Sequence, residues 1–234
     1  MQIGDIIEIL KPVFQNAQRQ QLRGVQLREG LAAATDGRIL VKVEMPGFVP
    51  TEAAAKASYA PALDMRPEEP AQRFAGRDWI LETLGPAIEE EWCRIVSRFN
   101  KERDAAVEEF NRISIECPHC GENLALDKTD GWTSRYLLTF DDWIELNATP
   151  PIKSPIHIAL HVPGIPEDFR VFVRDIYRAL VVAMRLGTAD ALLLAEHQLQ
   201  LVGKGFLIIV CSTGYVHTAS IRTLSVAAGE GGRG

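Results

Sequence analysis

The chain has 234 residues, of which 47% are hydrophobic and 24% charged. This composition is typical of a folded globular protein and excludes a disordered chain. The chain carries no apolar run of the roughly 18 residues that a membrane-spanning helix needs. The formal net charge of −6 argues against indiscriminate nucleic-acid binding but leaves room for a local basic stripe.

Two features of the chain bear on its compartment. The N-terminal segment has Asp5 and Glu8 among periodic apolar residues, which is not the pattern of a signal peptide. The four cysteines suit a reducing compartment better than a disulfide framework, because two of them stand in a CxxC pair. We therefore expect a cytoplasmic protein with no membrane association.

The first 45 residues predict a helix followed by three antiparallel strands. Apolar residues recur at helical spacing from Ile3 to Gln18. Short strands are then expected near residues 22–27, 31–35 and 39–43. Asp36-Gly37 joins the last two and predicts a type I′ turn, in which both residues need positive φ.

Residues 46–155 differ in composition from both ends of the chain and are expected to form an insertion. Residues 46–80 hold several prolines and predict an irregular or partly helical linker. Pro86 suits the first turn of a helix, whose apolar stripe runs to Ile113, about 42 Å at 1.5 Å per residue. Four aromatic residues then predict a small satellite core: Trp132, Tyr136, Phe140 and Trp143.

Residues 156–213 repeat the order of the first half with one strand added in front. A strand over residues 156–162, a helix from Glu167 to Leu186 and three short strands are expected, the last two joined at Gly203-Lys204-Gly205. Residues 214–234 predict a flexible tail. The expected fold class is α+β, in which two helix-plus-antiparallel-strand halves flank a mainly helical insertion.

Cys117-Pro-His-Cys120-Gly is the typical turn of a zinc knuckle, since the proline and glycine let backbone amides approach the thiolates. A structural zinc ion needs four ligands, and only one CxxC pair is present. The remaining ligands are open: Cys93, His157 and His161 are candidates in the same chain, and a second chain is another source. Without metal, the motif is a tight turn. With metal, zinc is expected to be structural and to pin the insertion.

Two resemblances bear on function. The stretch from Cys117 to Leu124 fits the CPxCxxxL pattern of the zinc hooks of double-strand-break repair ATPases, although no second coiled-coil helix follows it. The segment GVQLREGLAAATDGRILVKV, residues 24–43, resembles the segment around the ATDG-type turn of DNA polymerase sliding clamps of the bacterial β type. This second resemblance covers residues 1–45 and 156–212.

The sliding-clamp resemblance implies a replication accessory protein in which helices line a ring around double-stranded DNA. Such clamps carry three domains per chain, whereas this chain has material for one. A closed ring would then need about six subunits, or the protein no longer encircles DNA. The resemblance implies a homo-oligomer, a DNA polymerase or another replication protein as a partner, and an origin in a bacteriophage or mobile element.

A basic stripe on the helix expected from Glu167 to Leu186 agrees with that implication. Four arginines fall within an arc of about 80° at 100° per residue, which is how phosphate contacts are arranged along one surface. The candidate DNA-binding residues are these four and two near the first helix: Arg170, Arg174, Arg178, Arg185, Lys11 and Arg19. A solvated arginine face or an acidic protein partner would produce the same pattern.

No Walker A loop, GxGxxG, HExxH or GxSxG motif occurs in the sequence. We therefore expect a protein that is not an enzyme and that contacts the DNA backbone without sequence specificity. The alternatives are a zinc-knuckle adaptor or regulator that binds protein or nucleic acid through the insertion, and a hydrolase or nuclease with scattered acids.

Overall fold

The structure is a computed structural model that describes residues 2–15, 17, 19, 22–51, 61–70, 72–126, 137–138, 157–161, 169–213 and 222–225. The fold is α+β, as expected from the sequence. The chain forms two compact units, Met1–Trp92 with Ile156–Gly234, and Cys93–Pro155. The predicted insertion, residues 46–155, is thus divided between the two units.

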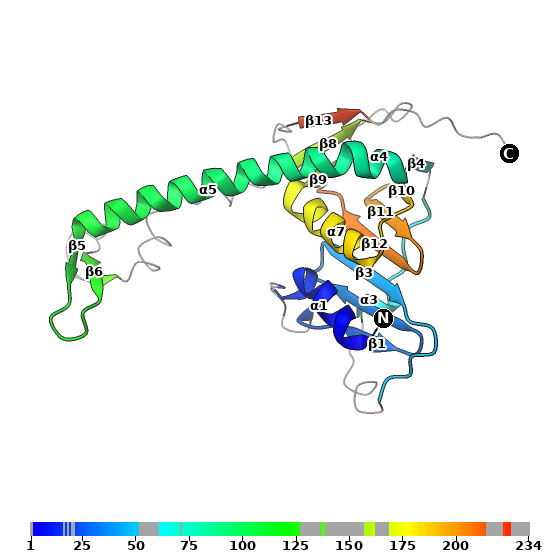
Figure 1. The fold of residues 1–234 in the computed structure, drawn as a ribbon, viewed down its shortest axis with the longest axis horizontal. Coiled ribbons are helices and arrows are strands. Elements are labelled where there is room, and N and C mark those ends of the chain that lie inside the picture. The colour runs from blue at the N-terminus through cyan, green and yellow to red at the C-terminus, as the bar shows by residue number, and fades with distance from the viewer. Residues whose placement is uncertain are drawn as a thin grey trace. The chain divides into compact units, whose positions relative to one another are not determined.

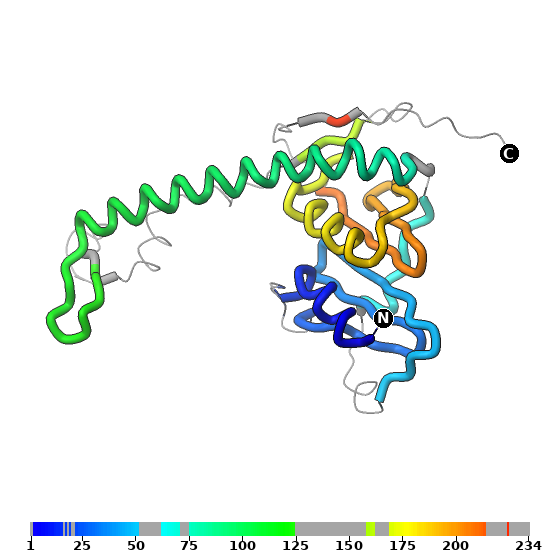
Figure 2. The backbone as a smooth tube through the Cα atoms, in the orientation of Figure 1, coloured from blue at the N-terminus to red at the C-terminus, as the bar shows by residue number. Residues whose placement is uncertain are grey.

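The first unit contains a seven-stranded antiparallel sheet (Figure 1). Its strand order is β1-β2-β3-β12-β11-β10-β4. The first half supplies β1 (Gln26–Arg28), β2 (Leu31–Thr35) and β3 (Ile39–Glu44), and the second half supplies β10 (Ala191–Leu194), β11 (Gln198–Gly203) and β12 (Phe206–Cys211). β4 (Gln72–Gly76) adds the other edge. In Figure 2 the sheet carries colours from both ends of the scale, because the two halves meet where β3 pairs with β12.

Two helices cover one face of this sheet (Figure 1). α1 (Ile3–Phe14) contacts β2 and β3, α7 (Val173–Leu186) contacts β12, and the two helices contact each other. Side chains alternate between the two faces of a strand. Those on the sheet face that α1 and α7 cover are apolar. They include the buried residues Ala32, Ala34, Ile39, Val41, Leu199, Leu201, Ile208 and Val210. Burial of this set against the helices stabilises the unit.

The opposite face of the sheet is covered by residues 61–70, which begin with α3 (Pro61–Asp64). Ala62 and Leu63 pack on Ala33, Leu40 and Ile209. Polar side chains of the sheet hold the backbone of this segment. Lys42 Nζ donates to the carbonyl of Leu63 at 3.0 Å, Gln26 accepts from the N–H of Ala62 at 2.9 Å, and Gln200 donates to the carbonyl of Glu68 at 2.8 Å. These bonds explain why buried positions of β1 and β11, and a half-buried position of β3, carry polar residues.

A second, three-stranded sheet completes the first unit, with the order β13-β8-β9. Its strands are β8 (His157–His161), β9 (Phe169–Phe172) and β13 (Arg222–Ser225). After β4 come α4 (Arg77–Trp79), a π-helical turn η2 (Ile80–Leu84) and the long helix α5 (Gly85–Ile113). Trp92 of α5 stacks on Tyr177 of α7, with ring centroids 5.1 Å apart, so the start of α5 packs beside α7.

The second unit contains the rest of α5 and a three-stranded antiparallel sheet, β5 (Ser114–Glu116), β6 (Asn123–Leu126) and β7 (Leu137–Leu138). The long helix expected from Pro86 to Ile113 is confirmed. The satellite core expected around Trp132, Tyr136, Phe140 and Trp143 lies outside the described residues.

Two expectations about the second half are wrong. The helix expected from Glu167 begins only at Val173, because Phe169–Phe172 pairs with β8 as strand β9. Phe169 and Val171 have the spacing of one strand face, whereas Phe169 and Phe172 have helical spacing, so this segment fits a strand as well as a helix. The tail expected from Gly214 contains strand β13, which pairs with β8 in parallel. Leu224 in this strand is buried.

The turn between β2 and β3 differs from the expected type I′ geometry. Asp36 and Ile39 pair at its base, with an N–H to carbonyl distance of 3.3 Å, so the two turn residues are Gly37 and Arg38. Only Gly37 has a positive φ, +95°. Asp36 Oδ1 accepts from the N–H groups of Arg38 and Ile39, both at 2.9 Å. The Asp36 side chain therefore caps the turn.

Candidate nucleic-acid face and metal knuckle

The exposed side of the α1 and α7 layer carries three of the predicted DNA-binding residues. Arg174 and Arg185 are exposed on α7, and Lys11 is exposed on α1, where it pairs with Glu8 at 3.5 Å. Arg19 is also exposed and follows α1 in the chain. The acidic residues Asp5 and Glu8 lie exposed on α1 as well, so the positive charge of this face is concentrated on α7.

Arg170 is not part of the helical stripe, which corrects the expectation from the sequence. It lies on β9, three residues before α7 begins, and its carbonyl accepts from the N–H of Thr213 at 3.1 Å. Because Arg170 lies on a strand, the 100° spacing that aligned it with Arg174 does not apply to it.

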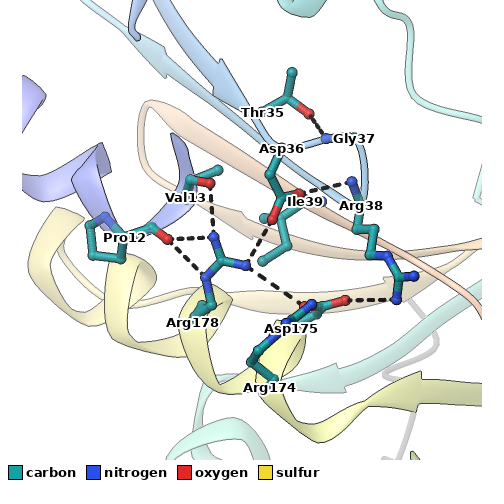
Figure 3. Close-up of polar contacts among 10 residues, drawn as sticks. All are labelled: Pro12, Val13, Thr35, Asp36, Gly37, Arg38, Ile39, Arg174, Asp175 and Arg178. Atoms are coloured by element: carbon teal, nitrogen blue, oxygen red, sulfur yellow. Dashed lines mark hydrogen bonds and ion pairs between the residues drawn. The ribbon is translucent and has the colours of Figure 1, made fainter. Parts of the chain in front are cut away.

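Arg178 turns inward and joins the two halves (Figure 3). Its Nε donates to the carbonyl of Pro12 at 2.8 Å, and Nη2 donates to the carbonyl of Val13 at 2.8 Å. Nη1 pairs with Asp36 Oδ2 at 2.7 Å. The side chain is only 16% exposed. The guanidinium therefore satisfies carbonyls at the end of α1 and the carboxylate of the β2–β3 turn, and it is not presented to a phosphate.

The five residues Asp36, Arg38, Arg174, Asp175 and Arg178 form an arginine–aspartate cluster around this contact (Figure 3). Asp175 is only 1% exposed, and three arginines approach its carboxylate: Arg174 Nε at 3.2 Å, Arg178 Nη1 at 3.8 Å and Arg38 Nη1 at 3.9 Å. Its Oδ2 atom has no hydrogen-bond partner among the described residues.

Burial controls the ionisation of Asp175. Desolvation raises the pKa of this carboxyl above its ordinary value, and the nearby Asp36 carboxylate acts in the same direction, while Arg174 and Arg178 oppose the shift. The Arg38 guanidinium also lies 4.4 Å from the centroid of the Phe172 ring, so a cation–π contact helps to hold it beside the cluster.

The candidate metal knuckle, residues 117–121, lies between β5 and β6, which form an antiparallel hairpin. Cys117 N–H donates to the carbonyl of Glu122, and Gly121 N–H donates to the carbonyl of Cys117, both at 2.8 Å. Gly121 has a φ of +71°, which a residue with a side chain adopts at a cost. The sequence thus closes the turn as the CPxCG motif predicts.

The two sulfur atoms of the knuckle lie side by side. Hydrogen bonds from the N–H groups of His119 and Cys120, and from the Cys120 side chain, lower the pKa of Cys117 below that of an ordinary thiol. Cys117 is half-buried and Cys120 exposed. Two thiols on one tight turn fit a zinc ion that prefers sulfur ligands.

The other candidate zinc ligands lie on other elements of the chain. Within the described residues, no group of three or more His, Cys, Asp and Glu side chains is placed to hold a metal ion. Cys93 lies on α5, 20 residues before Ile113, a rise of about 30 Å at 1.5 Å per residue. His157 and His161 lie on β8 of the first unit.

The chain matches no protein-family model, no curated protein and no solved structure. In the part of the chain that the structure describes, every helix is too short or too polar to cross a bilayer.

Sequence reasoning missed the cluster residues Arg38 and Asp175 and the segment over the second face of the sheet. Asp175 precedes Arg178 by three residues on α7, which is the spacing of neighbours on one helix face. The sequence therefore contains a pattern from which the Asp175–Arg178 pair could be predicted. No sequence pattern indicates the contacts of Arg178 with Pro12 and Val13, because these residues are far apart along the chain.

Proposed function

We propose that this protein is a non-enzymatic accessory factor of DNA replication, similar in design to a sliding clamp, that contacts duplex DNA through the α1 and α7 layer. The observation that carries the proposal is the pairing of the two halves. Each half supplies one helix and three strands, the strands join in one sheet at β3 and β12, and both helices lie on the same face. Such a layer offers DNA two neighbouring helices.

The charges of this face set the strength of the contact. Arg174, Arg185 and Lys11 are the exposed cations on the two helices, and Asp5 and Glu8 oppose them. Each phosphate contact contributes a slope of about −0.9 to log K against log salt, so two or three contacts per chain give weak binding. Useful affinity therefore requires several copies, which is why we propose a homo-oligomer.

The remaining parts of the proposal follow from the clamp-like design. The protein acts in the cytoplasm of a bacterial cell, is encoded by a bacteriophage or mobile element, and assists a DNA polymerase or another replication protein. In this proposal its contacts are with the DNA backbone, and phosphate contacts carry no information about the base sequence.

The test is the affinity for random-sequence duplex DNA, measured by fluorescence anisotropy over a range of salt concentrations. Arg174→Ala with Arg185→Ala should weaken binding and flatten the salt slope by about 2, at about 0.9 per contact. Arg66→Ala with Arg77→Ala is the matched control, since both arginines are exposed and lie outside the helix layer. Equal loss in the two double variants, or no DNA binding by the parent in any assembly state, would overturn the proposal.

A second candidate function is an adaptor that binds its target through the knuckle. The observation in its favour is Ile115, which is 60% exposed next to the knuckle. The double variant Cys117→Ser with Cys120→Ser separates the two functions in the same DNA-binding assay. Loss of DNA binding in this variant, with full binding in the Arg174 and Arg185 variant, would favour the adaptor.

A further inference from the structure

Two exposed arginines, Arg38 and Arg174, lie beside the same buried carboxylate although they come from different elements (Figure 3). Arg38 belongs to the turn between β2 and β3, and Arg174 to the first turn of α7. Arg174 Nε lies 3.2 Å from Asp175 Oδ1, and Arg38 Nη1 lies 3.9 Å from Asp175 Oδ2. Both arginine side chains remain about half exposed. The carboxylate therefore gathers two guanidinium groups at one place on the surface.

The acidic groups of this cluster do not balance its arginines. Of the three arginines around Asp175, Arg178 is already paired with Asp36 at 2.7 Å. This leaves Arg38 and Arg174 with Asp175 alone. Burial raises the pKa of that carboxyl, which favours its uncharged form. The exposed part of the cluster thus carries an excess of positive charge whether or not Asp175 is ionised.

The Arg38 guanidinium is held in place by contacts other than hydrogen bonds. Its distance of 3.9 Å from Asp175 Oδ2 is too long for a hydrogen bond, and Oδ2 has no hydrogen-bond partner among the described residues. The guanidinium also lies 4.4 Å from the centroid of the Phe172 ring. This cation–π contact fixes the position of the group and leaves its N–H donors available. Donors that are already positioned favour the binding of an anion.

We propose that Arg38 and Arg174 together bind one phosphate group, with Asp175 as the positioning residue behind them. A guanidinium presents its N–H donors in a planar fork, and phosphate oxygens accept short, charge-assisted hydrogen bonds from such a fork. Asp175 is only 1% exposed, so it does not touch the phosphate. It holds the two guanidinium groups together against their mutual repulsion, which a bound anion relieves.

A phosphate group of this kind belongs either to the DNA backbone or to a free phosphate. The site stands on the geometry of the cluster, whereas its assignment to the DNA backbone rests on the proposed function. Arg174 is one of the exposed cations of the α1 and α7 layer. In that case Arg38 adds a contact from the β2–β3 turn, outside the two helices, and the DNA-contacting surface extends to the end of the layer at which α7 begins.

The first measurement is a titration of the full chain with inorganic phosphate at neutral pH and constant ionic strength, followed by NMR of the arginine Nε–H groups. The signals of Arg38 and Arg174 should shift with one common dissociation constant. The exposed arginines Arg66 and Arg77 lie outside the cluster, and their signals should not follow this constant. Arg38→Gln should weaken phosphate binding at Arg174 about tenfold, since it removes a charge-assisted hydrogen bond. Arg66→Gln, the matched control, should leave it unchanged.

The second measurement repeats the anisotropy assay with random-sequence duplex DNA. If the bound phosphate belongs to DNA, Arg38→Gln should weaken binding and reduce the salt slope by about 0.9, and Arg66→Gln should do neither. Unchanged DNA binding in Arg38→Gln, together with weakened phosphate binding, would assign the site to a free phosphate.

The two measurements also separate this inference from the proposed function. Phosphate binding at Arg38 and Arg174 by a parent chain that binds no DNA would support the site and refute the proposed function. If the Arg38 and Arg174 signals did not respond to phosphate, or responded no more than those of Arg66 and Arg77, the inference would be wrong.

Discussion

At the scale of single residues, Arg178 shows how one side chain can connect parts of the chain that are far apart in the sequence. Its guanidinium has five N–H donors in a planar fork, and the structure uses this fork on Pro12, Val13 and Asp36 at once. A lysine also has three N–H donors, but they radiate from one nitrogen, whereas the guanidinium places donors on three nitrogens of a planar fork. The residue at this position is therefore fixed by the geometry of three acceptors as well as by charge.

Replacing Arg178 by Ala should lower the free energy of unfolding by about 2–4 kcal/mol, because the Asp36 carboxylate and two carbonyls would lose a largely buried partner. Arg178→Lys should recover part of the loss. Arg185→Ala, an exposed change on the same helix, should alter stability by less than about 0.5 kcal/mol. Urea denaturation followed by circular dichroism measures all three. Equal stability of the Arg178 and Arg185 variants would contradict the inward orientation.

Asp175 makes stability depend on pH in a direction opposite to that of an ordinary salt-bridged acid. Its pKa is raised in the folded protein, while the unfolded chain has the ordinary value of about 3.9. Between these two values the folded state holds a proton that the unfolded state releases. The free energy of unfolding therefore falls as pH rises through this window.

Asp175→Asn should remove this contribution. We expect the stability of the variant, relative to the parent, to increase from pH 4 to pH 7, because only the parent loses stability from this group. Urea unfolding at several pH values tests this, with Glu8→Gln as a control for removal of an exposed carboxylate. A relative stability that stays constant, or decreases with pH, would contradict the raised pKa.

At the scale of elements, the turn between β2 and β3 holds the first half together and also contributes Asp36 to the contact with α7. Gly37 has a φ of +95°, and a Cβ atom built there would meet only Leu22 Cδ1, at 4.0 Å. There is thus room for a side chain, and the obstacle is the backbone conformation alone.

Gly37→Val should therefore destabilise the protein by about 1–3 kcal/mol, since a β-branched residue is forced into positive φ. Gly37→Asn should cost less, because asparagine tolerates positive φ better than other residues. Thermal unfolding of the two variants gives the comparison. If valine and asparagine were equally tolerated, the turn would not have the φ described here.

Elements with strong local patterns were predictable from the sequence. The strands at 31–35 and 39–44 and the hairpin from Gln198 to Cys211 alternate apolar residues around glycine-containing turns, and the long helix has a continuous apolar stripe. α3 and β4 have only four and five residues and no pattern of their own, because their place is set by contacts with the sheet. The sequence predicts helix where β9 lies, because the apolar residues of Phe169–Phe172 fit the period of a helix as well as that of a strand.

The candidate site was predictable only in part, for a related reason. On α7 Arg178 lies about 40° from Arg174 and about 20° from Arg185 around the helix axis. The helical pattern therefore places all three arginines on one face and does not show that one of them is buried. What separates them is the end of α1, whose carbonyls lie beside Arg178 alone. The knuckle was recognisable from its own residues because a tight turn is a local structure.

At the scale of the whole molecule, the central pairing of the seven-stranded sheet has a consequence for folding. β3 and β12 lie side by side, with Val41 opposite Ile208, although residues 45–205 separate them along the chain. The loop-closure entropy of such a pairing opposes it until both partners exist, and non-local pairing of this kind is slow.

During synthesis, the first half leaves the ribosome long before its partner strand. β3 then has an open edge with apolar residues such as Ile39 and Val41, and an unpaired edge of this kind invites pairing with another nascent chain. Native folding therefore requires β12 to pair with β3 before another nascent chain does. We therefore expect the yield of native protein to depend on how fast the ribosome completes residues 191–211.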